Sequence, residues 1–169
     1  MQALHHKGRP NLIAFLRRLA ATVRSPDKLV VSGSSAGGFG AALNYDLFRR
    51  FFPNAKSYLI DDSGPPMIGN AIPEDLHNKW YAAWGLEQTL APLCPSCQSD
   101  FSSLVPILAK KYPNDRMALL SNNQDQVIRG FFGQQSAMDF QNNLYAMADA
   151  IIDPQPNFHY YFTDRKSVV

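Results

Sequence analysis

Four short apolar runs alternate along this chain with longer segments whose apolar residues recur at helical spacing, and this alternation limits the possible folds more than any other feature. The apolar runs are residues 28–31, 56–61, 116–121 and 157–163. The helical segments are residues 12–23, 41–52, 101–112 and 136–152. Strands joined through helices of this length pair in parallel, through right-handed crossovers. The sequence therefore predicts an α/β fold whose parallel sheet carries helices on both faces.

One domain accounts for the whole chain. Its 169 residues, of which 46% are hydrophobic, suffice to bury a sizeable core. Residues 63–100 are richer in Pro, Gly and polar residues than the rest, and they contain one helix-like piece, residues 73–85. We therefore expect a single domain, residues 1–169, with residues 63–100 as a lid-like insertion above the sheet.

Charge and hydropathy exclude two classes of partner. The chain has 16 Lys and Arg against 14 Asp and Glu, a formal charge of +2, and its basic residues form no long run. The doublets Arg17-Arg18 and Arg49-Arg50 fall on predicted helices, where a solvated face is the favoured interpretation. No apolar stretch reaches the roughly eighteen residues of a membrane span, and the amino-terminal residues contain no apolar core of a secretory signal. We predict no nucleic-acid partner and no membrane span; the oligomeric state stays open.

The two cysteines form the motif Cys94-Pro-Ser-Cys97. A structural zinc needs four ligands, and neither a second Cys pair nor a nearby His pair is present. The surrounding segment is a proline-punctuated loop rather than a helix start after a strand, which disfavours a thioredoxin-like site. A disulfide that staples the loop in an oxidising compartment is favoured, with two free thiols as the alternative.

The stretch VSGSSAGGFG, residues 31–40, lies between a predicted strand and a predicted helix. Gly33 and Gly37 flank Ser35 at the G-x-S-x-G spacing of a nucleophile elbow, a tight turn that presents a serine at the carboxyl end of a parallel strand. The helix that follows lets the Ala36 backbone N–H stabilise an oxyanion. A plain glycine-rich turn is the alternative. The spacings of a P-loop and of a dinucleotide fingerprint are both absent, and we predict no cofactor.

A nucleophilic serine needs an acid and a base, which in this fold class follow it along the chain in that order. Asp125 and Asp62 both come directly after predicted strands. We favour Asp125 as the triad acid. Its alternative role is to cap the helix that begins with Gln126, and the alternative role of Asp62 is an Asx hydrogen bond in the turn before Gly64.

The histidines offer no clear base. His5 and His6 precede the serine, and His77 lies in the insertion. His159 follows Asp125 but falls inside the last predicted strand, so a structural role is favoured over the role of base.

Five stretches together resemble the pectin acetylesterase and Notum family of α/β-hydrolase serine esterases. They are LHHKGRPNL, VVSGSSAGGFGAALNYD, IDDSGPP, the Trp80/Trp84 segment before CPSC, and SNNQDQVIRGFFG. The resemblance implies ester deacylation through a Ser-His-Asp triad without a cofactor, on acetylated pectin in plant and microbial members and on a fatty-acylated signalling protein in Notum. Ser35 matches the family's nucleophile and Asp125 its acid.

The chain departs from the family pattern at both ends. The resemblance implies further strands upstream, with a glycine-rich loop that donates a second oxyanion N–H, and a histidine just after YYFTDRKS. We therefore expect an α/β-hydrolase-like sheet that lacks its N-terminal strands. The resemblance and the CPSC pair favour a secreted or periplasmic location.

The expected function is deacetylation of a polysaccharide such as pectin, or of a similar short-chain acyl ester. The alternative is an inactive scaffold that binds a carbohydrate or a protein partner. Trp80, Tyr81 and Trp84 would roof the pocket of such an esterase, or else pack in its core.

Overall fold

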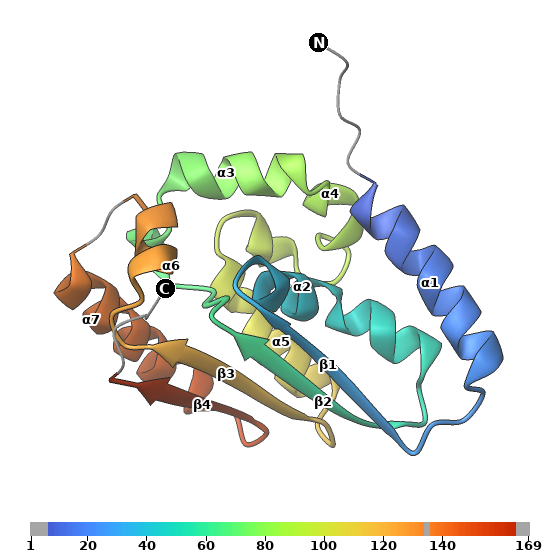
Figure 1. Ribbon diagram of the computed structural model, residues 1–169. Helices are drawn as coiled ribbons and strands as arrows, with labels where there is room; N and C mark the ends of the chain where they lie inside the picture. Colours follow the sequence, from blue (N-terminus) through green and yellow to red (C-terminus); the bar gives the residue numbers. More distant parts are fainter. Residues whose placement is uncertain (1–6, 134–135, 165–169) are drawn as a thin grey trace, which may run out of the picture.

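The computed structural model describes residues 7–133 and 136–164 and contains a four-stranded parallel sheet (Figure 1). The strands lie in the order β1 (Lys28–Ser34), β2 (Lys56–Asp62), β3 (Arg116–Asn122) and β4 (Phe158–Thr163). All four predicted strands are confirmed. β1 is longer than the predicted residues 28–31, because the backbone of residues 32–34 continues to pair with residues 60–62 of β2 although its side chains are small and polar.

Helices connect the strands and form the insertion. The longer ones are α1 (Gly8–Thr22), α2 (Ala36–Phe51), α3 (Glu74–Ala83), α5 (Leu104–Lys111) and α7 (Ala137–Met147), the last continued by the π-helical turn η4 (Ala148–Ile152). Shorter elements are α4 (Leu86–Thr89), α6 (Gln126–Phe131) and the 3₁₀ turns η1 (Gly69–Ala71), η2 (Pro95–Gln98) and η3 (Phe101–Ser103). None of the described helices is long and apolar enough to cross a membrane.

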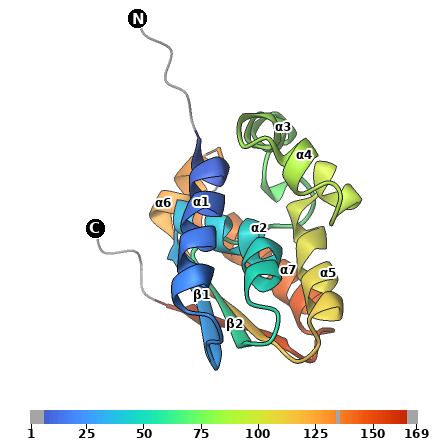
Figure 2. The same ribbon diagram turned by 90° about the vertical axis from the view of Figure 1, so that its right-hand side faces the viewer.

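The connecting helices α2, α5 and α7 lie on the same face of the sheet (Figures 1 and 2). The reason is the strand order: each strand is added beside the previous one in the same direction, so every right-handed crossover falls on one side. The predicted parallel α/β sheet is confirmed. Helices were predicted on both faces, and within residues 7–133 and 136–164 they cover one face. On the other face Val30 and Tyr161 are 58% and 67% exposed.

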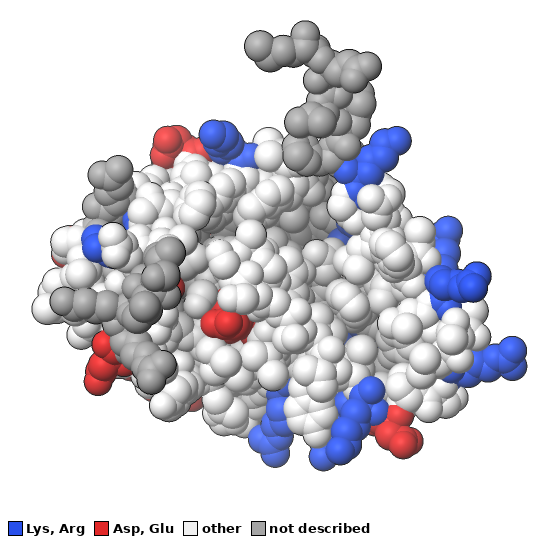
Figure 3. Space-filling model, in the orientation of Figure 1, with Lys and Arg blue, Asp and Glu red and all other residues white. Residues whose placement is uncertain are grey.

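The core lies between the sheet and these helices. A row of residues in register across the strands, Val31, Leu59, Met117 and Phe158, is buried there, and α7 adds Phe140, Leu144 and Met147. The open face, seen in Figure 3, shows few charged side chains in its middle, and Lys and Arg gather along its lower edge. Lys28, Lys56 and Arg116 begin three of the strands there.

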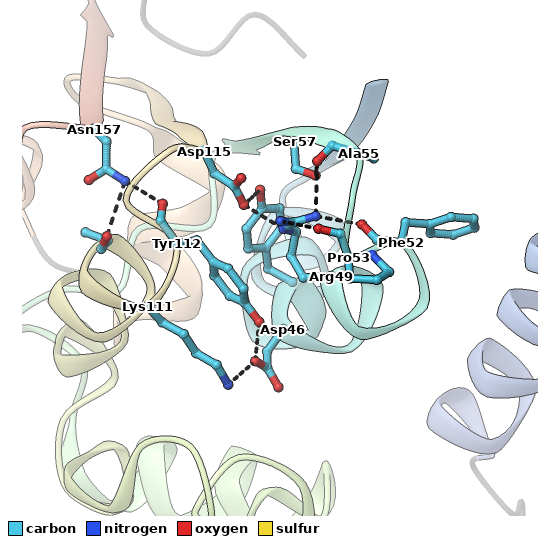
Figure 4. A network of polar contacts seen from close by, with 12 residues as sticks. Asp46, Arg49, Phe52, Pro53, Ala55, Ser57, Lys111, Tyr112, Asp115 and Asn157 are labelled. Carbon is cyan, nitrogen blue, oxygen red and sulfur yellow. Dashed lines mark hydrogen bonds and ion pairs between the residues drawn. The ribbon is translucent and has the colours of Figure 1, made fainter. Parts of the chain in front are cut away.

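A polar network joins α2 to α5 and to the start of β3 (Figure 4). Asp115 accepts a hydrogen bond from the Tyr45 hydroxyl at 2.8 Å and forms an ion pair with Arg49, whose Nε lies 2.8 Å from Asp115 Oδ2. All three side chains are largely buried. Burial, together with the hydrogen bond to Asp115, raises the pKa of Tyr45. Asp46 pairs with Lys111 in the same network. The network lies at the amino ends of β2 and β3, so its role is to hold the scaffold.

Candidate active site

Ser35 occupies the turn between the last residue of β1 and the first residue of α2. Its backbone has φ 57° and ψ −120°, and Ser35 and Ser63 are the two non-glycine residues with positive φ in the described part of the chain. L-residues rarely adopt such angles, and they persist where the surrounding structure holds them. Here the Ser35 N–H donates a 2.7 Å hydrogen bond to the Asp62 carbonyl of the neighbouring strand. This is the backbone geometry that a nucleophile elbow requires.

Close backbone contacts make two glycines necessary at this turn. A Cβ on Gly33 would lie 2.0 Å from the Gly37 carbonyl oxygen. A Cβ on Gly38 would lie 2.3 Å from Asp61 Oδ1 and 2.7 Å from the Asp62 carbonyl oxygen. By contrast, a Cβ on Gly37 or Gly40 would have nothing within 4 Å. The close approach of α2 to the sheet therefore requires a glycine at position 38 but not at position 40.

The predicted oxyanion donor, Ala36, is the first residue of the 16-residue helix α2 and is exposed. A residue in this position has no acceptor for its N–H within the helix. The helix dipole adds a partial positive charge at the same end. A developing negative charge next to Ser35 would therefore meet a favourable field.

Two neighbouring carboxyl groups on β2 have different surroundings. Asp62 is half-buried, and its Oδ1 accepts a hydrogen bond from the Ser63 hydroxyl at 3.0 Å. Asp61 is 2% exposed, and burial raises its pKa well above the ordinary value, with a further contribution from Asp62 and an opposing one from the Gly64 N–H. Sequence reasoning did not single out Asp61. The sequence feature that could have revealed it is the alternation of inward and outward side chains along a strand, because Asp61 shares the inward face with Leu59.

Asp125, the predicted triad acid, is 5% exposed and is the N-cap of α6. Its Oδ1 accepts hydrogen bonds from the Val127 and Ile128 N–H groups, both at 2.9 Å. The alternative role of Asp125, a helix cap, is thus observed. Both of these capping hydrogen bonds go to Oδ1 rather than to Oδ2. β2 separates β1 from β3 in the sheet, so the ends of β1 and β3 lie roughly 10 Å apart. An imidazole with a hydrogen bond on each side spans roughly 8 Å, and the serine and carboxylate side chains at the two ends supply the rest.

Neither described histidine forms a hydrogen bond with Ser35. His159 lies inside β4, as the sequence predicted, where it is exposed and pairs in register with Ala118. His77 is buried in α3, with its ring centroid 4.0 Å from that of Phe101. His5, His6 and the residues after position 164 lie outside the described residues.

The insertion packs through its aromatic side chains. Trp80 and Trp84 stack at a centroid distance of 5.2 Å, and both contact Phe39 in the first turns of α2. Trp84 remains 41% exposed, so the pair borders both core and solvent. The predicted loop staple is confirmed: Cys94 and Cys97 form a disulfide and are fully buried. Among the described residues, no cluster of three or more His, Cys, Asp or Glu side chains is placed to hold a metal ion.

A parallel α/β sheet with a strained serine between a strand and the helix that follows defines an α/β-hydrolase-like fold. No protein-family model matches the chain, and a search of curated proteins finds no match. Among solved structures, the chain is similar to the Wnt deacylase Notum from Drosophila, with a TM-score of 0.60 and 17% sequence identity. The similarity covers 89% of this chain and 49% of the Notum chain, so the chain spans about half the length of that protein. At this identity the likeness establishes the fold.

Proposed function

We propose that the chain carries the nucleophile half of a serine carboxylic-ester hydrolase. The observation that carries the proposal is the backbone of Ser35, whose positive φ is held between β1 and the amino end of α2. Strain of this kind concentrates at functional sites. The similarity to a structure described as a Wnt deacylase supports the same type of chemistry.

In the proposed reaction, Ser35 Oγ attacks the carbonyl carbon of an ester, and its proton passes to a base. The Ala36 N–H stabilises the oxyanion that forms on the carbonyl oxygen. The alcohol then leaves with the proton from the base, and water hydrolyses the acyl-serine by the same steps in reverse. Asp125 orients the base, for which we propose a histidine outside the described residues.

The proposed substrate is an acetylated polysaccharide such as pectin, or a similar short-chain acyl ester. It rests on the resemblance of the sequence motifs to the pectin acetylesterase and Notum family. In this proposal Trp80, Tyr81 and Trp84 of the lid-like insertion border the acyl or sugar pocket above α2.

A second function is favoured by one observation: neither described histidine, His77 or His159, forms a hydrogen bond with Ser35. An α/β-hydrolase-like scaffold without a base would bind a carbohydrate or a protein partner and would catalyse no reaction.

Labelling with a fluorophosphonate probe, followed by mass spectrometry of the labelled peptide, distinguishes the two. The full chain, Ser35→Ala and the matched control Ser34→Ala are compared, and hydrolysis of p-nitrophenyl acetate is followed in parallel. Ser34 is exposed and adjacent but lies on the strand rather than at the turn, so Ser34→Ala should keep the label. We expect Ser35→Ala to lose it.

Labelling and turnover that both need Ser35 would support the esterase. Labelling of Ser35 without turnover would identify an activated serine that lacks its base. If Ser35→Ala labels as the unsubstituted chain does, the elbow is not an activated nucleophile and the scaffold function takes its place.

A further inference from the structure

A cavity of about 280 Å³ lies within the insertion, away from the serine turn. Its walls come from η1, α3 and the segment of η2 and η3. Of these elements, α3 lies at the top of the molecule in Figures 1 and 2. Its floor is apolar, because Met67, Ile72 and Phe101 line it and are 1%, 4% and 2% exposed. This volume is close to the lower limit of about 300 Å³ for small-ligand pockets.

The rim of the cavity is polar and carries no basic side chain among the described residues that line it. These rim residues are Asn70, Glu74, Asn78, Gln98, Ser99 and Asp100. The amides both donate and accept hydrogen bonds, and ionised carboxylates only accept. Two carboxylates without a nearby cation disfavour an anionic ligand, while the amide donors need acceptors on the ligand. Hydroxyl groups meet both requirements.

The His77 side chain also lines the cavity. The side chain is 5% exposed, and Nε2 has no hydrogen-bond partner among the described residues. Its ring is held between Phe101, at a centroid distance of 4.0 Å, and Tyr81, at 6.1 Å. Since the surface of Nε2 is covered, the His77 ring contributes its apolar side rather than a hydrogen bond to the cavity.

The wall opposite α3 is rigid. The Cys94–Cys97 disulfide closes η2, and the N–H groups of Ser99 and Asp100 both bond the Ser96 carbonyl at 3.1 Å. Asp100 Oδ1 in turn accepts the Ser102 N–H at 2.9 Å, which fixes the carboxylate at the start of η3. A wall that is ordered before binding loses little entropy when a ligand arrives.

We propose that this cavity binds one neutral sugar ring, with the sugar hydroxyls on the polar rim and the apolar face of the sugar on the floor. The proposal does not rest on the proposed esterase function, since binding here requires no chemistry at Ser35. It also assigns a role to the disulfide, which shapes the wall that carries Gln98.

The test is a saturation-transfer NMR titration of the full chain with D-glucose, D-galactose and D-mannose, and with charged analogues of the first two. D-Glucuronate and D-galacturonate are the anionic analogues of glucose and galactose, and D-glucosamine is the cationic analogue of glucose. We expect at least one neutral hexose to bind saturably, and its uronate to bind at least about tenfold more weakly because of the two carboxylates.

Two substitutions locate the site. Asn78→Ala and Gln98→Ala each remove an exposed amide from the rim. Each should weaken hexose binding by about tenfold, the equivalent of one hydrogen bond. The matched control Gln88→Ala, exposed on α4 outside the cavity, and Ser35→Ala should bind as the unsubstituted chain does.

The proposal is overturned if no neutral hexose binds, if the uronates bind equally well, or if glucosamine binds more tightly than glucose, which would assign the cavity to cations. Equal binding by Gln98→Ala and Gln88→Ala would also overturn it. Because Ser35→Ala should not change hexose binding in this titration, the outcome is independent of the esterase test.

Discussion

Substitution of Gly38 by alanine tests whether contact between α2 and β2 shapes the serine turn. The new Cβ would lie 2.7 Å from the Asp62 carbonyl oxygen, which itself holds the Ser35 N–H. A carbon and an oxygen approach to about 3.3 Å without strain, so the backbone must move by about 0.6 Å. Overpacking of this size costs about 1–3 kcal/mol.

Gly40→Ala is the matched control, because it lies in the same helix and its Cβ would meet nothing within 4 Å. Alanine is favoured over glycine in a helix by about 1 kcal/mol at both positions. The difference in free energy of unfolding between the two variants therefore isolates the cost of overpacking. We expect Gly38→Ala to be about 1–3 kcal/mol less stable than Gly40→Ala.

Urea unfolding followed by far-UV circular dichroism measures this difference as a shift of the midpoint at constant slope. If the esterase proposal holds, fluorophosphonate labelling of Ser35 should also be about tenfold slower or worse in Gly38→Ala, because displacement of a reacting group slows the reaction steeply. Equal stability of the two variants would refute the argument that the α2–β2 contact excludes a side chain at position 38.

Two further substitutions test buried polar groups. Burial raises the pKa of Asp61, so the folded state holds a proton that the unfolded state releases, and stability falls as pH rises above the ordinary pKa of 3.8. Asp61→Asn cannot ionise, and its advantage over the unsubstituted chain should grow by up to about 1.4 kcal/mol per pH unit above that value; parallel urea stability curves would contradict this. Tyr45→Phe removes a hydroxyl that donates to Asp115 at 2.8 Å and should cost about 2 kcal/mol, whereas Tyr161→Phe, 67% exposed, should cost almost nothing; equal unfolding midpoints for the two would show that the network does not stabilise the fold.

Periodicity correctly predicted the strands and the long helices because those signals are local. Apolar residues on one face recur at every second position in a strand and at every third or fourth position in a helix, and neither spacing depends on residues far away along the chain. The same pattern overestimated how much of α1 is buried. Leu16 is buried, but Phe15, which belongs to the same apolar repeat, is 74% exposed. A repeat shows which residues share a face, and the partner that covers this face is a tertiary matter.

The serine turn was predictable in position but not in detail. The spacing of Gly33, Ser35 and Gly37 indicated an elbow, yet the close contact at Gly38 depends on Asp61, which is 23 residues away along the chain. The spacing likewise left Asp125 with two possible roles. Its helix cap is visible only once α6 is in place, and its proposed role as triad acid awaits experiment.

The sequence by itself determined the parallel α/β class and the junction where Ser35 lies, since both follow from short-range spacing. The tertiary structure decided the order β1-β2-β3-β4, and with it the single helical layer and the open face that bears Val30. It also decided which of two adjacent carboxyls is buried and brought His77 against Phe101 to line a cavity. These features depend on pairs of residues far apart along the chain, whose contacts form only when the sheet and the insertion pack together.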